Sequence, residues 1–142
     1  MELSDWFKGF EEGIARLQPE QRSAFFAECG RHCVNGGTLS IYEKLFEDAQ
    51  GDMDLFFQMA NGLSGVRAEV VEKGRVYRLV FLECTCDLRE KGYVTTPLLC
   101  ECSRQSVLYS LRSLWKGRDF DVALRHSILR GGQDCEMRIE VI

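Results

Sequence analysis

Apolar residues in the first 65 positions recur at helical spacing and predict four helices. The first helix has one apolar stripe, formed by Leu3, Trp6, Phe7, Phe10, Ile14 and Leu17. Pro19 occupies the first position of a second helix, which is expected to end before Asn35-Gly36-Gly37. Thr38 and Asp52 are the expected N-caps of the third and fourth helices.

After Gly65 the apolar period changes to two, which predicts β-strands. Residues 66–72 and 75–86 flank Lys73-Gly74, a hairpin turn that places Glu69 opposite Arg78 as a favourable cross-strand pair. An amphipathic helix follows, with Ser103 as its expected cap and Gly117 at its end.

The last segment of the chain alternates again and predicts a second hairpin. Its tight turn at Gly131-Gly132 pairs Ile128 with Cys135 and His126 with Met137, all on one face. The predicted class is therefore α+β, with N-terminal helices packed on an antiparallel sheet of two hairpins separated by an amphipathic helix. The length of 142 residues predicts one domain over 1–142, with a helical part at 1–65 and a hairpin-helix-hairpin part at 66–142.

Charge and hydropathy remove several classes of partner. No apolar run approaches the roughly 18 residues needed to cross a bilayer, so no membrane partner is expected. The net charge is −4 with no basic block, which argues against a nucleic-acid partner. The acidic N-terminus lacks the features of a secretory signal, so we expect a cytoplasmic protein. The oligomeric state stays open, with a homodimer among the options.

Seven cysteines are the most informative feature of the composition. The number is odd and the chain has no secretory signal, so a disulfide framework is a poor interpretation. Cys84-Thr85-Cys86 and Cys100-Glu101-Cys102, if extended, would each point two thiols the same way. The four cysteines Cys84, Cys86, Cys100 and Cys102 are thus candidate ligands of a zinc ion. An iron–sulfur cluster, a redox or nucleophilic role, and simple burial remain alternatives.

Two further groups of residues are candidates for a site. Cys29 and Cys33 lie at helical spacing on the face that carries Phe25 and Phe26, so these four residues either line a ligand pocket or fill the core. The predicted register of the last hairpin brings His126 and Cys135 to one face, as a base and a nucleophile or as a buried pair.

The last hairpin also carries a resemblance to a known family. The run RHSILRGGQDCEMRI, from Arg125 to Ile139, resembles the C-terminal part of 4-vinyl reductase domains and the related 2-aminothiazoline-4-carboxylate hydrolase-like proteins. The segments LECTC (82–86) and LCEC (99–102) resemble the cysteine-bearing strand and helix of that group. The resemblance covers roughly residues 66–142, and its glycine turn is Gly131-Gly132 in place of the glycine-acidic-proline turn often seen there.

The resemblance implies a fold similar to the ligand-binding domains of nitric-oxide-sensing and vesicle-tethering proteins. It also implies a small, largely apolar molecule held between helices and sheet, in some members beside a cysteine-bound metal. Together with the paired thiols, the resemblance leads to the prediction of a small-molecule-binding or sensor-type domain with a cysteine-lined site, for which zinc is the candidate metal. One alternative is a hydrolase of a cyclic C–N bond that uses Cys135 and His126, and another is an interaction module that zinc stabilises.

Overall fold

The computed structural model describes residues 2–84 and 86–142. The helices are α1 (Leu3–Arg16), α2 (Pro19–Cys33), α3 (Leu39–Asp48), α4 (Met53–Ala60), α5 (Asp87–Glu90) and α6 (Cys100–Leu114). The strands are β1 (Val66–Glu72), β2 (Val76–Phe81), β3 (Phe120–His126) and β4 (Cys135–Val141). Within these residues, no helix combines the length and the apolar character needed to cross a membrane.

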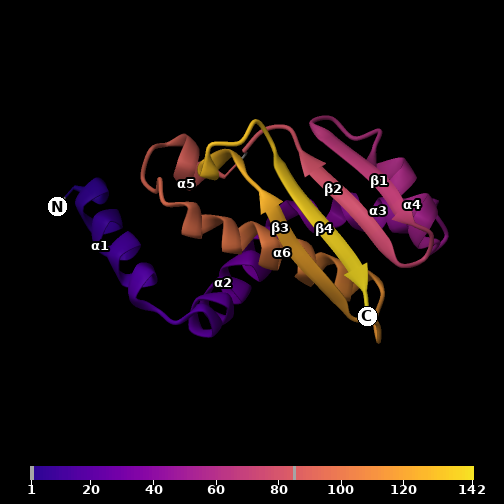
Figure 1. The fold of residues 1–142 in the computed structure, drawn as a ribbon, viewed down its shortest axis with the longest axis horizontal. Helices are drawn as coiled ribbons and strands as arrows, with labels where there is room; N and C mark the ends of the chain where they lie inside the picture. Colours follow the sequence, from indigo (N-terminus) through magenta and orange to yellow (C-terminus); the bar gives the residue numbers. More distant parts are fainter. Residues whose placement is uncertain (1, 85) are drawn as a thin grey trace.

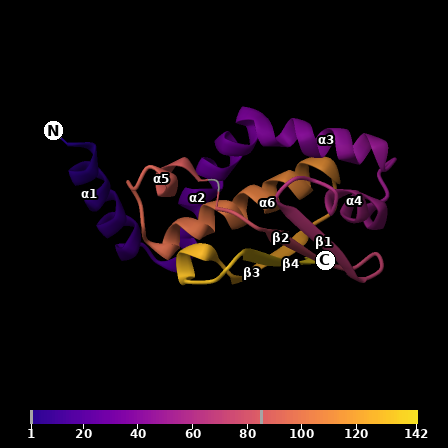
Figure 2. The ribbon, with the colours of Figure 1, turned by 90° about the horizontal axis from the view of Figure 1, so that it is seen from above.

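The four strands form one antiparallel sheet in the order β1-β2-β4-β3. Figures 1 and 2 show α3, α4 and α6 on one side of this sheet, with α1 and α5 at one end of the molecule. The predicted α+β class is confirmed. Glu69 lies opposite Arg78, as predicted, and the two side chains form an ion pair of 3.2 Å.

The main core fills the space between the inner face of the sheet and the helices. Alternate strand residues face the helices, and Tyr77, Met137 and Ile139 are completely buried there. The Tyr77 ring stacks on Phe57 with ring centroids 4.3 Å apart, and its hydroxyl donates a hydrogen bond of 2.6 Å to Asp54. Burial of this face is the main force that holds the two layers together.

The opposite face of the sheet carries charged side chains in place of a second helical layer. Arg78 forms ion pairs with both Glu69 and Glu136, and Arg75 forms one of 2.7 Å with Glu140. These pairs alternate in sign across neighbouring strands, which keeps a polar face compatible with solvent.

A second, smaller core lies at the end of the molecule where α1 packs. Its buried members are Ile14, Phe26, Val94 and Leu99. The helices α2 and α6 approach each other closely at Gly30, where an added Cβ atom would lie 2.9 Å from Ser106 Oγ. Gly30 therefore sets how near these two helices can lie.

Helix boundaries agree with the sequence analysis only in part. Asp52 caps α4 as predicted, because its carboxylate accepts a hydrogen bond of 2.9 Å from the Leu55 N–H. Thr38 does not cap α3, because the chain continues from α2 through a wide helical turn at Val34–Thr38 that bends at Gly37. The expected cap Ser103 is also wrong, since α6 begins at Cys100.

Candidate functional site

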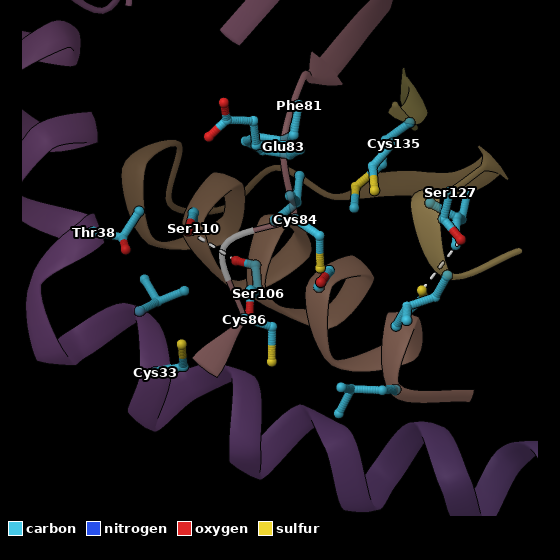
Figure 3. Close-up of a pocket in the computed structure, with 18 of the residues that line it drawn as sticks. Cys33, Thr38, Phe81, Glu83, Cys84, Cys86, Ser106, Ser110, Ser127 and Cys135 are labelled. Atoms are coloured by element: carbon cyan, nitrogen blue, oxygen red, sulfur yellow. Dashed lines mark hydrogen bonds between the residues drawn. The ribbon is translucent and has the colours of Figure 1, made fainter. Parts of the chain in front are cut away.

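A cavity of about 160 Å³ lies between α6, the end of α2, the end of β2 and the strand β4 (Figure 3). Among the described residues, those that line it are Cys33, Val34, Thr38, Tyr42, Phe81, Glu83, Cys84, Cys86, Leu99, Cys100, Ser103, Ser106, Val107, Ser110, Leu124, Ser127, Leu129, Cys135 and Met137. A cavity of about 150 Å³ lined by apolar side chains is large enough to hold a benzene molecule. The space thus suits one small ring or a short alkyl chain.

Five of the seven cysteines line this one cavity. Figure 3 shows Cys33 entering from α2 and Cys135 from β4, on opposite sides, with Cys84 and Cys86 on the segment between β2 and α5. Cys100 reaches it from the start of α6. Thiols from four separate segments of the chain therefore meet at one cavity.

Three serine hydroxyl groups in the wall already have partners within the protein. Ser106 and Ser110 each donate a hydrogen bond of 2.8 Å to a carbonyl one turn earlier in α6. Ser127 is completely buried, and its oxygen accepts from the Cys100 thiol at 3.3 Å and from the Arg130 N–H at 3.2 Å. Among the described residues, no buried side-chain nitrogen or oxygen lacks a partner. The wall therefore offers a ligand chiefly apolar carbon and sulfur.

Burial holds several of the thiols in the neutral form. It raises the pKa of Cys100 and of Cys135 above the ordinary thiol value. It raises the pKa of Cys102 to about 12, and the nearby thiols of Cys29, Cys33 and Cys86 act in the same direction. Neutral thiols behave as small apolar groups and are poor nucleophiles.

The four cysteines predicted to bind zinc do not share one orientation. Cys84, Cys86 and Cys100 line the cavity, whereas Cys102 does not, and both Cys86 and Cys102 pack against the second core. The reason is that Cys100 and Cys102 form the first turn of α6, where residues two apart point away from each other. The extended backbone assumed for this pair is wrong. Within residues 2–84 and 86–142, no three metal-ligating side chains are grouped around one point.

The predicted ligand-binding residues of α2 are divided between the cavity and the second core. Cys33 lines the cavity, but Cys29 does not. Phe26 is buried in the second core, and Phe25 packs on it edge-to-face with ring centroids 5.2 Å apart. Phe26 is thus a core residue, whereas Phe25 is exposed, and neither side chain lines the cavity.

The structure separates His126 from Cys135. A β-bulge between Leu124 and His126 shifts the register, so that His126 lies opposite Glu136 and not opposite Met137. This shift turns His126 to the outer face of the sheet, where its ring hydrogen-bonds with Asp134. Cys135 instead lies opposite Phe81 and accepts a hydrogen bond of 3.4 Å from the Ile128 N–H. The predicted register at this turn is wrong.

Several wall residues are not among the sequence-predicted site residues, notably Phe81, Ser127 and Met137. Phe81 and Met137 lie within the segments whose alternating pattern predicts strands. No local signal distinguishes them from the rest of the inner face. The buried Ser127 follows the bulge, which the sequence pattern does not reveal.

Comparison with known proteins finds distant structural similarity but no sequence relative. No protein-family model matches the chain, and no curated protein matches its sequence. A solved structure that is similar is the trafficking protein particle complex subunit 3 from Naegleria fowleri, covalently bound to palmitic acid. Its TM-score is 0.46 at 12% sequence identity, over 99% of this chain and 93% of that chain. This similarity is too low to transfer a function, so function must be inferred from the residues of this chain.

Proposed function

We propose that this protein is a binding domain for a small, largely apolar molecule, which occupies the cysteine-lined cavity. The observation that supports the proposal most is the composition of the wall, which is chiefly carbon and sulfur, with the hydroxyls of Ser106, Ser110 and Ser127 already bonded within the protein. A polar ligand would find few unpaired partners there, whereas an apolar one gains by leaving water.

The thiols give the cavity a soft, polarizable lining. An ordinary thiol is already mostly neutral at pH 7, and burial raises the pKa of Cys100 and of Cys135 further above the ordinary value. Sulfur makes favourable contacts at the edge of aromatic rings. A small aromatic molecule therefore fits this wall better than a saturated chain of the same volume.

Benzene is a suitable probe, since it matches the size of the cavity. We expect the melting temperature of the purified chain to rise with benzene concentration, because a ligand that binds only the native state stabilises it. Cys135→Leu should remove this rise by filling the cavity. Cys29→Leu, a matched change at an exposed cysteine outside the cavity, should retain it.

A melting temperature of the wild-type chain that stays constant up to saturating benzene would contradict the proposal. An equal loss of the response in Cys135→Leu and in Cys29→Leu would also contradict it, since the effect would then come from outside the cavity.

Zinc binding and C–N bond hydrolysis remain separate predictions with their own tests. Elemental analysis of the purified chain should find about one zinc per chain if Cys84, Cys86 and Cys100 belong to a metal site, and Cys84→Ser should then lower the content. Hydrolysis of a cyclic thioimidate that depends on Cys135 should disappear in Cys135→Ser. The raised pKa of Cys135 and the outward-facing His126 give the hydrolase less support than the binding domain has.

A further inference from the structure

A second hollow lies on the other side of the first turn of α6 and has a different chemistry. It measures about 420 Å³ and is lined by residues of α2, α6, β3 and the two turns beside them: Pro19, Arg22, Ser23, Pro97, Leu98, Glu101, Arg104, Leu124 and Arg130. We call it the arginine groove. Leu124 lines both this groove and the cysteine-lined cavity, so the two sites are neighbours.

Three guanidinium groups and one carboxylate face the groove, and the charges of Arg104 and Glu101 neutralise each other. Arg104 binds Glu101 through two nitrogen atoms, at 2.5 and 2.7 Å. Ser23 and Gln105 donate to the same carboxylate at 2.8 and 3.1 Å. Burial raises the pKa of Glu101, but these hydrogen bonds together hold it below its ordinary value. Glu101 is therefore ionised and fully occupied by protein donors.

The other two arginines keep their positive charge. Arg22 donates to the carbonyls of Ile14 and Leu17, at 3.1 and 3.0 Å, and these neutral groups hold the side chain in place without neutralising it. Arg130 is exposed on the turn after β3. Neither Arg22 nor Arg130 forms an ion pair within residues 2–84 and 86–142. The groove thus has a net charge of about +2.

This positive groove stands out in a chain whose net charge is −4. Planar guanidinium groups bind phosphate and carboxylate oxygens through paired hydrogen bonds. A phosphate monoester carries about −1.5 to −2 charges at neutral pH, which matches the groove. Pro19, Pro97, Leu98 and Leu124 provide an apolar wall for the organic part of such an ester.

We propose that the arginine groove binds a small-molecule phosphate monoester, with its phosphate between Arg22 and Arg130. The volume of the groove lies in the range typical of small-molecule sites. The proposal does not depend on the apolar ligand of the cysteine-lined cavity, because different side chains carry it.

Isothermal titration calorimetry of the full chain with phenyl phosphate, and separately with inorganic phosphate, tests the proposal. We expect phenyl phosphate to bind more tightly than inorganic phosphate, and its affinity to fall as salt is added. Arg130→Gln should weaken phenyl phosphate binding about tenfold or more, since it removes a charged donor. The affinity of Arg130→Lys, which keeps the charge but not the paired donors, should lie between that of wild type and that of Arg130→Gln.

Arg67→Gln is the matched control, because Arg67 is an exposed arginine on β1 at the opposite edge of the sheet. It should leave the affinity within about twofold of the wild-type value. Arg22→Gln should also weaken binding, with circular dichroism used to check that α1 and α2 stay folded, since Arg22 holds the end of α1.

Three results would overturn the proposal. The first is no heat of binding with either probe at millimolar concentration. The second is equal weakening by Arg130→Gln and Arg67→Gln, which would mean non-specific charge attraction. The third is equal affinity for both probes, which would assign the groove to the free anion and not to an ester.

Discussion

Filling the cysteine-lined cavity should stabilise the protein, and Cys135→Leu is the substitution that tests this most sharply. Cys135 begins β4, lies opposite Phe81 and faces the cavity. Leucine keeps the apolar character of the neutral thiol and adds two carbon atoms at the point where the space is free. In a tightly packed interior the same change would cost free energy by overpacking.

The magnitude follows from the carbon atoms that leucine adds and the hydrogen bond that it removes. Burying two more carbon groups contributes about 1.6 kcal/mol, at about 0.8 kcal/mol each. Removing the weak hydrogen bond from the Ile128 N–H to the sulfur, which is 3.4 Å long, costs about 0.5 kcal/mol. We therefore expect the free energy of unfolding to rise by about 1 kcal/mol. For a chain of this size that corresponds to a melting temperature about 2–4 °C higher.

Urea denaturation followed by circular dichroism, together with calorimetry, measures both quantities. Cys29→Leu serves as the control, since Cys29 is exposed and lies outside the cavity, and its effect should stay within about 0.5 kcal/mol. A Cys135→Leu chain that is less stable than wild type by about 1 kcal/mol or more would refute the reasoning, because it would mean that no free space exists beside Cys135.

Three other predictions concern the framework of the site. Gly30→Ala should destabilise the protein by about 1–3 kcal/mol in urea denaturation, because the new Cβ atom would lie 2.9 Å from Ser106 Oγ. The control Gly9→Ala, whose new Cβ atom would have no neighbour within 4 Å, should stabilise the protein by up to about 1 kcal/mol because alanine favours the helix. Glu101→Gln should lower the free energy of unfolding by about 1–2 kcal/mol at pH 7, because it removes a carboxylate whose pKa is held low by its hydrogen bonds. The difference from wild type should shrink as the pH falls below about 4, where the wild-type carboxylate becomes protonated. A difference that stays constant from pH 7 to pH 3 would contradict this explanation. Iodoacetamide at pH 8 should alkylate the exposed Cys33 well before Cys102, whose pKa is about 12, as measured by peptide mass spectrometry. The reverse order would show that the Cys102 thiol is not buried.

Most of the framework follows from local patterns in the sequence. The strands β1 and β2 were predictable because apolar and polar residues alternate along them, and the Glu69–Arg78 pair has the expected position. The two-residue turn was not, because a bulge after Val70 places Glu72 opposite Val76 and leaves residues 73–75 in the turn. The cap at Asp52 was predictable because an acidic residue before an apolar helix accepts hydrogen bonds from free N–H groups.

The start of α6 was missed although a signal for it is present. Thr96 accepts a hydrogen bond of 3.3 Å from the Leu98 N–H, and Pro97 occupies the first position of a short 3-10 helix that leads directly into α6. A threonine followed by proline is a known start signal for a helix. This signal, which precedes Ser103 in the chain, places Cys100 and Cys102 on a helix and not on a strand.

The composition of the site could be predicted from the sequence only in outline. The sequence indicates a cysteine-lined site, but which cysteines share it depends on how α2, α6 and β4 pack, and no local pattern records that packing. The bulge that turns His126 outward is likewise invisible to period-two alternation, because one extra residue reverses the face of everything that follows. The arginine groove joins residues from Pro19 to Arg130, which only the tertiary fold brings together.

Nuclear Overhauser spectroscopy of the methyl-labelled chain with benzene tests the central claim most directly. The account predicts contacts between benzene protons and the methyl groups of Met137, Val107 and Leu129, which line the cavity. It predicts none to Ile14, which is buried in the second core. Contacts to Ile14 alone, or no contacts at all with benzene at saturation, would contradict the claim that this cavity holds a small apolar molecule.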